Sequence, residues 1–160
     1  MSSSVPVVLP AFKTLVTSAL PVGSTIWTGA VMPVAQAGPG DVTGIASGVI
    51  LQIISVHFDA DQFAESGPTY KHEEHYNIQC SLCAWAGDDN YDQRVQDVYT
   101  AYADLSIAIG ASPRLGLGAD QIRLAWPRQL SLSITPDALG RSSACIDFEV
   151  QVQARVASQS

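Results

Sequence analysis

Charged side chains are scarce in this 160-residue sequence, where Asp, Glu, Lys and Arg make up only 14% of the residues, against roughly 25% in a typical domain. Basic residues are the scarcer kind, with eight Lys and Arg against fifteen acids. Tight binding around nucleic acid needs clustered basic side chains that displace counterions, so this balance argues against that class of protein. Disordered chains combine few apolar residues with many charges, whereas this chain is 47% hydrophobic. The sequence therefore predicts one folded domain over residues 1–160.

Long apolar runs and targeting signals are also missing. The most apolar stretch, Val49–Phe58, is shorter than the ~20 residues that span a bilayer. The first 21 residues lack a basic leader and are interrupted by Lys13 and three prolines. We therefore expect no membrane partner and no secretory signal. Three cysteines, an odd number, predict reduced thiols in a protein made in a cytoplasm.

Motifs that carry chemistry are incomplete. The pair Cys80 and Cys83 has Cys-x-x-Cys spacing, but in a strand these residues point to opposite faces. His72 and His75 are three residues apart, whereas the zincin pattern needs four. The Gly116-Leu117-Gly118 segment lacks the third glycine of a dinucleotide site. We expect no catalytic residue, no metal and no cofactor. A small Cys-x-x-Cys oxidoreductase and a monomeric ligand-binding domain remain as alternatives.

The acidic excess is confined to one stretch of the sequence. Charges cancel in residues 1–58 and again in residues 94–160. The whole net charge of −7 comes from residues 59–93, where Lys71 is the one base among eight acids. These acids are Asp59, Asp61, Glu65, Glu73, Glu74, Asp88, Asp89 and Asp92. The acidity is therefore local, and it lies at the two ends of residues 74–85, a segment that is expected to form one strand.

Apolar periodicity predicts the order of elements. Helices are expected over Pro10–Leu20 and from Tyr91 to Ile109, and strands over Thr25–Thr28, Val49–Phe58, Glu74–Trp85, Gln121–Trp126, Gln129–Thr135 and Ala144–Val156. Pro10 is expected in a first helical turn, Gly110 just after a helix, and Pro127 at a break between strands. Long loops are expected at 29–48 and 59–73. This order predicts an α+β fold, a mainly antiparallel sheet with two helices packed on one face.

The same order resembles the tail terminator proteins of long-tailed bacteriophages, the family of lambda-like minor tail proteins that cap the tail tube. The resemblance covers most of the chain. It consists of the order of the elements and of the types of residue along them. It rests on Phe12-Lys13-Thr14-Leu15, Ile26-Trp27-Thr28-Gly29, Glu74-His75-Tyr76-Asn77-Ile78-Gln79-Cys80, Trp85-Ala86-Gly87-Asp88-Asp89, Arg94-Val95-Gln96-Asp97-Val98, Pro113-Arg114-Leu115-Gly116 and Phe148-Glu149-Val150-Gln151-Val152-Gln153-Ala154-Arg155.

The resemblance implies a non-enzymatic virion protein of the tail or neck. It would form a homo-hexameric ring that ends tail-tube polymerisation and joins the tube to the head connector, while DNA passes through the bore without sequence-specific contact. Ring closure needs a heterologous interface, and the candidate residues for it are Asp147, Glu149, Gln151, Gln153 and Arg155 on the long last strand. The candidate residues for the bore are Asp59, Asp61 and Glu65. Another neck ring, either a head–tail connector or closure protein or a tube-like protein, is the nearest alternative.

Overall fold

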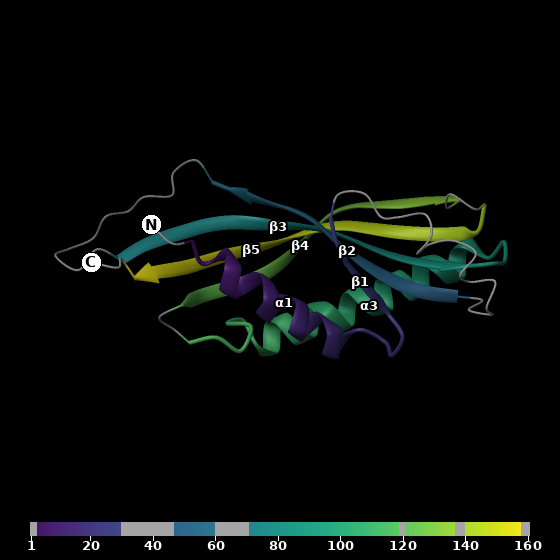
Figure 1. Ribbon diagram of the computed structural model, residues 1–160. Coiled ribbons are helices and arrows are strands. Elements are labelled where there is room, and N and C mark those ends of the chain that lie inside the picture. The colour runs from purple at the N-terminus through teal and green to yellow at the C-terminus, as the bar shows by residue number, and fades with distance from the viewer. Residues whose placement is uncertain (1–2, 30–46, 60–70, 119–120, 137–139, 158–160) are drawn as a thin grey trace.

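The computed structural model describes residues 3–29, 47–59, 71–118, 121–136 and 140–157, which form one sheet with a helix layer on one side (Figure 1). The elements are α1 (Val5–Ala19), β1 (Thr25–Thr28), β2 (Ser47–Phe58), β3 (Lys71–Ala86), α3 (Tyr91–Ala111), β4 (Ile122–Pro136) and β5 (Ser142–Ala157). The sheet order is β1-β2-β3-β5-β4, and β1 with β2 is the parallel pair. The predicted α+β class is confirmed.

Strict alternation along β3 and β5 gives the sheet two unlike faces. Even-numbered side chains from Tyr76 to Ala86 and from Ala144 to Ala154 are buried. They form one core with Val8, Phe12 and Val16 of α1 and with the buried side of α3. The odd-numbered side chains of the same strands point to the other face, which neither helix covers. We call this surface the uncovered face.

Helix α3 begins at Tyr91, as predicted, and buries one side of the helix against the sheet. The Asn90 side chain accepts a hydrogen bond from the Gln93 backbone N–H. The sequence analysis placed Gly110 just after the helix, but the residue lies inside it. The helix continues to Ala111 because the Ser112 N–H donates to the last carbonyls, which closes the helix without a glycine.

Helix α1 begins earlier than predicted. It starts at Val5, so Pro10 lies in the helix interior rather than in the first turn. Proline in that position costs ~3 kcal/mol because it removes a backbone hydrogen bond and crowds the preceding turn. Burial of apolar side chains on both sides of Pro10, at Val8 and Phe12, offsets this cost.

Strand β4 is continuous, in contrast to the predicted break at Pro127. The proline is tolerated because β4 is an edge strand, so a missing N–H on its outer side leaves no ladder bond unmade. Register shifts lie between Ile122 and Leu124 and between Gln129 and Ser131. These irregularities interrupt the predicted alternation, so that Ala125 is buried although it occupies an odd position.

The sequence analysis took both predicted loops a few residues too far at their C-terminal ends. Strand β2 already begins at Ser47, and β3 begins at Lys71, so the ends of the 29–48 and 59–73 segments are strand. The start of β3 is held by the end of β5, with Lys71 opposite Ala157. Residues 30–46 and 60–70 lie outside the described residues.

Candidate functional site: the uncovered face of the sheet

The five candidate interface residues lie in one row of β5 on the uncovered face. Asp147, Glu149, Gln151, Gln153 and Arg155 alternate with buried core residues of the same strand. The structure therefore brings together all five residues that the sequence singled out. They are presented as a face and not as a strand edge, because β5 is paired with β3 on one side and β4 on the other. The long strand β5 is therefore paired with strands of the same chain on both sides.

Glu149 is the most buried carboxylate of this row, with its side chain 7% exposed. Its Oε1 lies 2.8 Å from Nη2 of Arg128 on β4 and accepts a hydrogen bond from Nε2 of Gln151 at 3.3 Å. The nearby Asp147 carboxylate accepts from the Ser131 hydroxyl at 3.1 Å. The contacts of Arg128 and Ser131 cross from β4 to β5 and tie the edge strand to the sheet.

The other end of the row is paired with β3. Nε of Arg155 lies 3.7 Å from Oε1 of Glu73, and Nε2 of His75 lies 3.7 Å from Oε2 of the same carboxylate. Since these side chains are about a third exposed, each pair adds little stability. The uncovered face is thus a polar surface whose charges are largely matched within the chain.

Asp59, the first candidate bore residue, lies beside this row. A hollow of about 110 Å³ is lined by residues of β3, β4 and β5 together with Asp59. The lining residues are Asp59, His75, Tyr76, Asn77, Trp126, Gln151, Val152 and Gln153. The backbone N–H of Asp59 donates to the His75 carbonyl, which fixes its position. Asp61 and Glu65 lie outside the described residues.

Glu74, one of the eight acids of residues 59–93, lies on β3 and holds the start of α1 in place. Its Oε2 accepts hydrogen bonds from the Ser4 backbone N–H at 2.8 Å and the Ser4 hydroxyl at 2.6 Å. The Ser4 hydroxyl also lies 3.1 Å from the Tyr76 hydroxyl. Burial raises the pKa of Tyr76 to about 12, and the nearby Glu74 charge adds to this shift. No sequence pattern indicates this contact, because 70 residues separate its partners.

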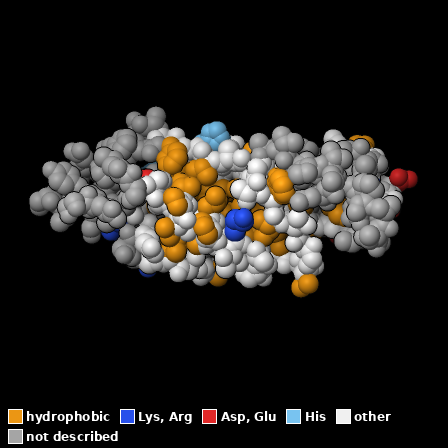
Figure 2. Space-filling model, viewed as in Figure 1, with side chains coloured by type: hydrophobic (Ala, Val, Ile, Leu, Met, Phe, Trp, Pro, Cys, Tyr) orange, Lys and Arg blue, Asp and Glu red, His pale blue; other side chains and the backbone are white. Residues whose placement is uncertain are grey.

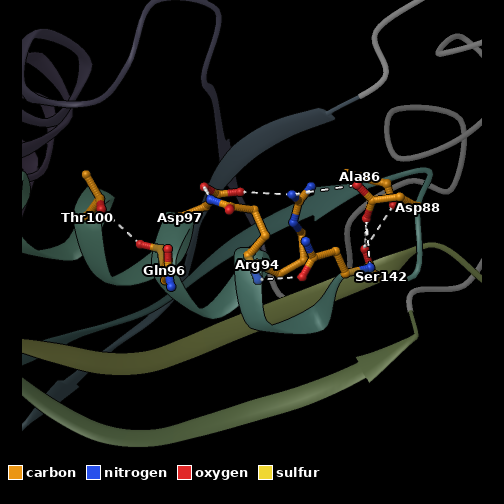
Figure 3. Close-up of polar contacts among 9 residues, drawn as sticks. Ala86, Asp88, Arg94, Gln96, Asp97, Thr100 and Ser142 are labelled. Carbon is orange, nitrogen blue, oxygen red and sulfur yellow. Dashed lines mark hydrogen bonds and ion pairs between the residues drawn. The ribbon is translucent and has the colours of Figure 1, made fainter.

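A second polar cluster lies at the opposite end of β3 (Figure 3). Nη2 of Arg94 lies 3.3 Å from Asp97 and 3.9 Å from Asp88. Asp88 also accepts from the Asn90 N–H and the Ser142 hydroxyl. These hydrogen bonds, with that of Asn90 the largest cause, hold the pKa of Asp88 below its ordinary value. The cluster joins the start of α3 to the adjacent ends of β3 and β5.

Arg94 itself is a buried cation that the sequence reasoning missed. Its side chain is 6% exposed, and its Nε and Nη1 have no hydrogen-bond partner among the described residues. Its spacing was the available signal, since Arg94, Val98, Ala101 and Leu105 step along the buried side of α3. A cation at such a position is unexpected unless carboxylates balance it, and here Asp88 and Asp97 do so.

The cysteines depart from the prediction of three reduced thiols, which is wrong. Cys83 forms a disulfide with Cys145, which lies directly opposite it on β5. Cys80 is a free thiol buried in the core, and this burial raises its pKa well above the ordinary value of a cysteine. Cys80 and Cys83 point to opposite faces, as predicted, so they do not form the redox pair of the oxidoreductase alternative. The Cys145 partner could be identified only once the strand register was known.

Two other kinds of feature are absent from the described parts of the chain. These residues contain no group of three or more His, Cys, Asp or Glu side chains that could hold a metal ion. Among the same residues, no helix is both long enough and apolar enough to cross a membrane.

Comparisons with known proteins add little to the chain's own features. No family model and no curated protein matches the chain. Among solved structures, a chain from one titled "Virion of native gene transfer agent (GTA) particle" aligns with 90% of this chain and 92% of its own length. The identity is 14% and the TM-score 0.45. A likeness of this size does not assign a function.

Proposed function

We propose that this chain is a structural virion protein of a long-tailed phage, a tail terminator whose copies form a ring at the end of the tail tube. In this function the ring ends tube polymerisation and docks the tube to the head connector. DNA passes through the bore without sequence-specific contact. The protein is not an enzyme and needs no cofactor, and its place is the tail or neck of the virion.

The observation that carries the proposal is the uncovered face. The sheet is covered by helices on one side, and on the other side β3, β4 and β5 carry polar side chains, several of them ion-paired. The hollow beside Asp59 on this face, of about 110 Å³, is smaller than the ~300–1,000 Å³ typical of ligand sites. A broad polar surface of this kind suits contact with other proteins better than the binding of a small substrate. The particular assembly, a ring at the end of a tail tube, is inferred from the sequence resemblance to tail terminators.

We assign two roles to this surface within the ring. The β5 row from Asp147 to Arg155 contributes to the contact between copies, and the segment with Asp59, Asp61 and Glu65 faces the bore. A ring repeats each acid around the axis, so this segment would form an acidic belt that repels DNA phosphates. The opposite end of β3 carries the second acidic zone, at Asp88 and Asp89. Asp59 lies beside His75, and the part of β3 from His75 to Ala86 separates it from this zone by roughly 35 Å.

Electron microscopy of the purified protein, with and without isolated tail tubes, tests the function. We expect rings in the protein alone and rings seated on tube ends in the mixture, with tube elongation stopped. Native mass spectrometry of the same sample should give six copies per ring. A protein that remains monomeric and leaves tube growth unchanged would contradict the proposal.

Another neck ring is the second candidate, because the same sheet-and-helix subunit would serve a head–tail connector, closure protein or tube-like protein. The microscopy experiment separates these functions when tail-less heads are included as a second target. Rings that seat on the head vertex and ignore tube ends would favour a connector. Stacks of many rings would favour a tube-like protein.

A further inference from the structure

The Cys83–Cys145 disulfide lies on the uncovered face of the sheet, away from the core. Both of its cysteines are partly exposed. Cys80, three residues before Cys83 on the same strand, points to the other face and is buried. Sulfur atoms exchange with other thiols only where a thiolate can reach them. Strand β3 therefore carries one cysteine that a dissolved thiol can reach and one that it cannot.

The surroundings of the disulfide are polar, which favours the approach of a water-soluble reagent. Ser133 of β4 lies opposite Cys145 and is exposed. Ser81 and Asp147, which lie opposite each other on β3 and β5, occupy the next position of each strand on the same face. On the helix side of the molecule, by contrast, hydrophobic side chains gather over α1 (Figure 2). The disulfide is thus part of the same polar surface as the β5 row.

The disulfide is not needed to bring its two strands together. All 16 residues of β3 are paired with β5. The pairs on both sides of the cysteines, Leu82 with Ile146 and Ala84 with Ala144, are buried in the core. A slip of the register by one residue would turn these core side chains to the uncovered face, so the register is strongly fixed. The two cysteines therefore stay opposite each other when the bond is broken, and a dithiol here can close again without refolding.

We propose that Cys83 and Cys145 form a reversible thiol–disulfide exchange site in the folded protein, whose substrates are low-molecular-weight thiols and their disulfides. A small thiol opens the bond, and a small disulfide closes it. The bond joins β3 covalently to β5 in an oxidising medium, whereas in a reducing medium backbone pairing and the core alone hold the two strands. This inference concerns the single chain and does not rest on the proposed ring.

Opening of the bond takes two steps. In the first, a small thiolate attacks Sγ of Cys145 and forms a mixed disulfide; the bond to Cys83 breaks, and Cys83 leaves as a thiolate that takes a proton from water. In the second, another small thiolate attacks the small-molecule sulfur of the mixed disulfide, and Cys145 leaves as a thiolate that is protonated in turn. Two small thiols are oxidised to one small disulfide while the protein disulfide is reduced to two thiols. Closing is the reverse of these steps.

The Ser81 hydroxyl favours attack at Cys145 rather than at Cys83. Its oxygen lies 3.7 Å from Sγ of Cys83. A hydroxyl at this position can donate a hydrogen bond to Cys83 as that sulfur leaves with negative charge. Exchange is faster when the leaving thiolate is more stable, so the incoming thiol should become attached to Cys145. Ser81 is a positioning residue for this reaction.

Labelling of the folded protein tests the site. Wild-type protein is incubated with reduced glutathione at neutral pH, freed of glutathione by gel filtration, and labelled with iodoacetamide without denaturant. We expect labels on Cys83 and Cys145 at least about tenfold sooner than on the buried Cys80, with the near-ultraviolet circular dichroism still that of folded protein. Oxidised glutathione added before the label should restore the disulfide. A bond that resists glutathione, or labels that appear on all three cysteines together, would overturn the proposal.

The urea dependence of the reduction rate separates exchange in the folded protein from exchange after unfolding. Reaction at a partly exposed bond uncovers little new surface, so the rate should change by less than about twofold below the unfolding transition. A route through the unfolded chain would accelerate with urea in parallel with the equilibrium population of unfolded protein. A rate that follows this population would overturn the proposal.

The variant Ser81→Ala tests the direction of attack, and Ser133→Ala, on the other side of the disulfide, is its matched control. Acid traps the mixed disulfide early in the reaction, and peptide mapping locates the attached glutathione. We expect glutathione mainly on Cys145 in wild type and control, and a larger share on Cys83 in Ser81→Ala. Glutathione mainly on Cys83 in wild type, or the same distribution in all three proteins, would overturn the assignment of Ser81.

Discussion

At the scale of single residues, Glu74 shows how an acid that looks like surface charge can hold a helix in place. Its carboxylate accepts the Ser4 N–H and hydroxyl at the start of α1, where the helix dipole favours negative charge. We predict that Glu74→Gln lowers the free energy of unfolding by about 1 kcal/mol, since the amide keeps an acceptor but loses the charge. Urea unfolding at pH 7 measures the change.

The matched control for this variant is the neighbouring residue. Glu73 lies on the uncovered face in partly exposed ion pairs with His75 and Arg155. Glu73→Gln should therefore cost clearly less than Glu74→Gln. Equal losses in the two variants would show that the contact with Ser4 adds no stability.

Asp88 gives the pH dependence of the other polar cluster. Its pKa is lowered in the folded protein, chiefly by the hydrogen bond from the Asn90 N–H. Its contribution to stability is therefore full above the ordinary Asp value of about 3.9 and is lost as pH falls through the lower folded value. We predict that wild type is more stable than Asp88→Asn at neutral pH and that this difference disappears in acid. Urea unfolding across pH 2–7 measures it, and a difference that stays constant with pH would show that the Asp88 charge is not its cause.

At the scale of elements, the Cys83–Cys145 disulfide joins β3 to β5 and closes a loop that contains α3. The two cysteines are 62 residues apart. Constraint of the unfolded chain by a loop of this length predicts a loss of about 4 kcal/mol in the free energy of unfolding when the bond is removed. Urea unfolding with and without a reductant measures this loss.

The double variant Cys83→Ser with Cys145→Ser is the control for the reductant. Its stability should match that of the reduced wild type and should not respond to further reductant. A thiol reagent should find one free thiol, Cys80, and only after unfolding, because this thiol is buried and its raised pKa keeps it protonated. A reactive thiol in the folded protein would contradict this arrangement.

The elements also differ in how well the sequence predicted them. Helix α3 and strand β5 were predicted closely, because the burial of one side leaves a periodic pattern that needs no knowledge of partners. The positions of Pro10 and Pro127 were misjudged. Local chemistry disfavours proline at both sites, but packing of α1 on the core and the edge position of β4 outweigh that preference.

At the scale of the whole molecule, the acidic segment gives a prediction about DNA passage. We expect that replacing Asp59, Asp61 and Glu65 with Lys slows DNA ejection or leaves DNA stalled in the neck, because a basic belt would hold the phosphates. Ejection from particles reconstituted with the variant measures the effect. Replacement of Asp89 and Asp92 with Lys is the control at the other end of β3, because neither of these acids takes part in the ion pairs of the buried Arg94. Unchanged ejection in the first variant would place that segment away from the bore.

The sequence by itself determined the fold class, the main helix, the alternating strands and the location of the acidic excess. Each of these depends on residue type and on the short-range repeat with which apolar side chains recur. The tertiary structure decided the contacts between distant segments: the Cys83–Cys145 bond, the Glu74–Ser4 contact and the burial of Arg94. Strand order and register set which distant residues meet, and a sequence pattern carries no record of either.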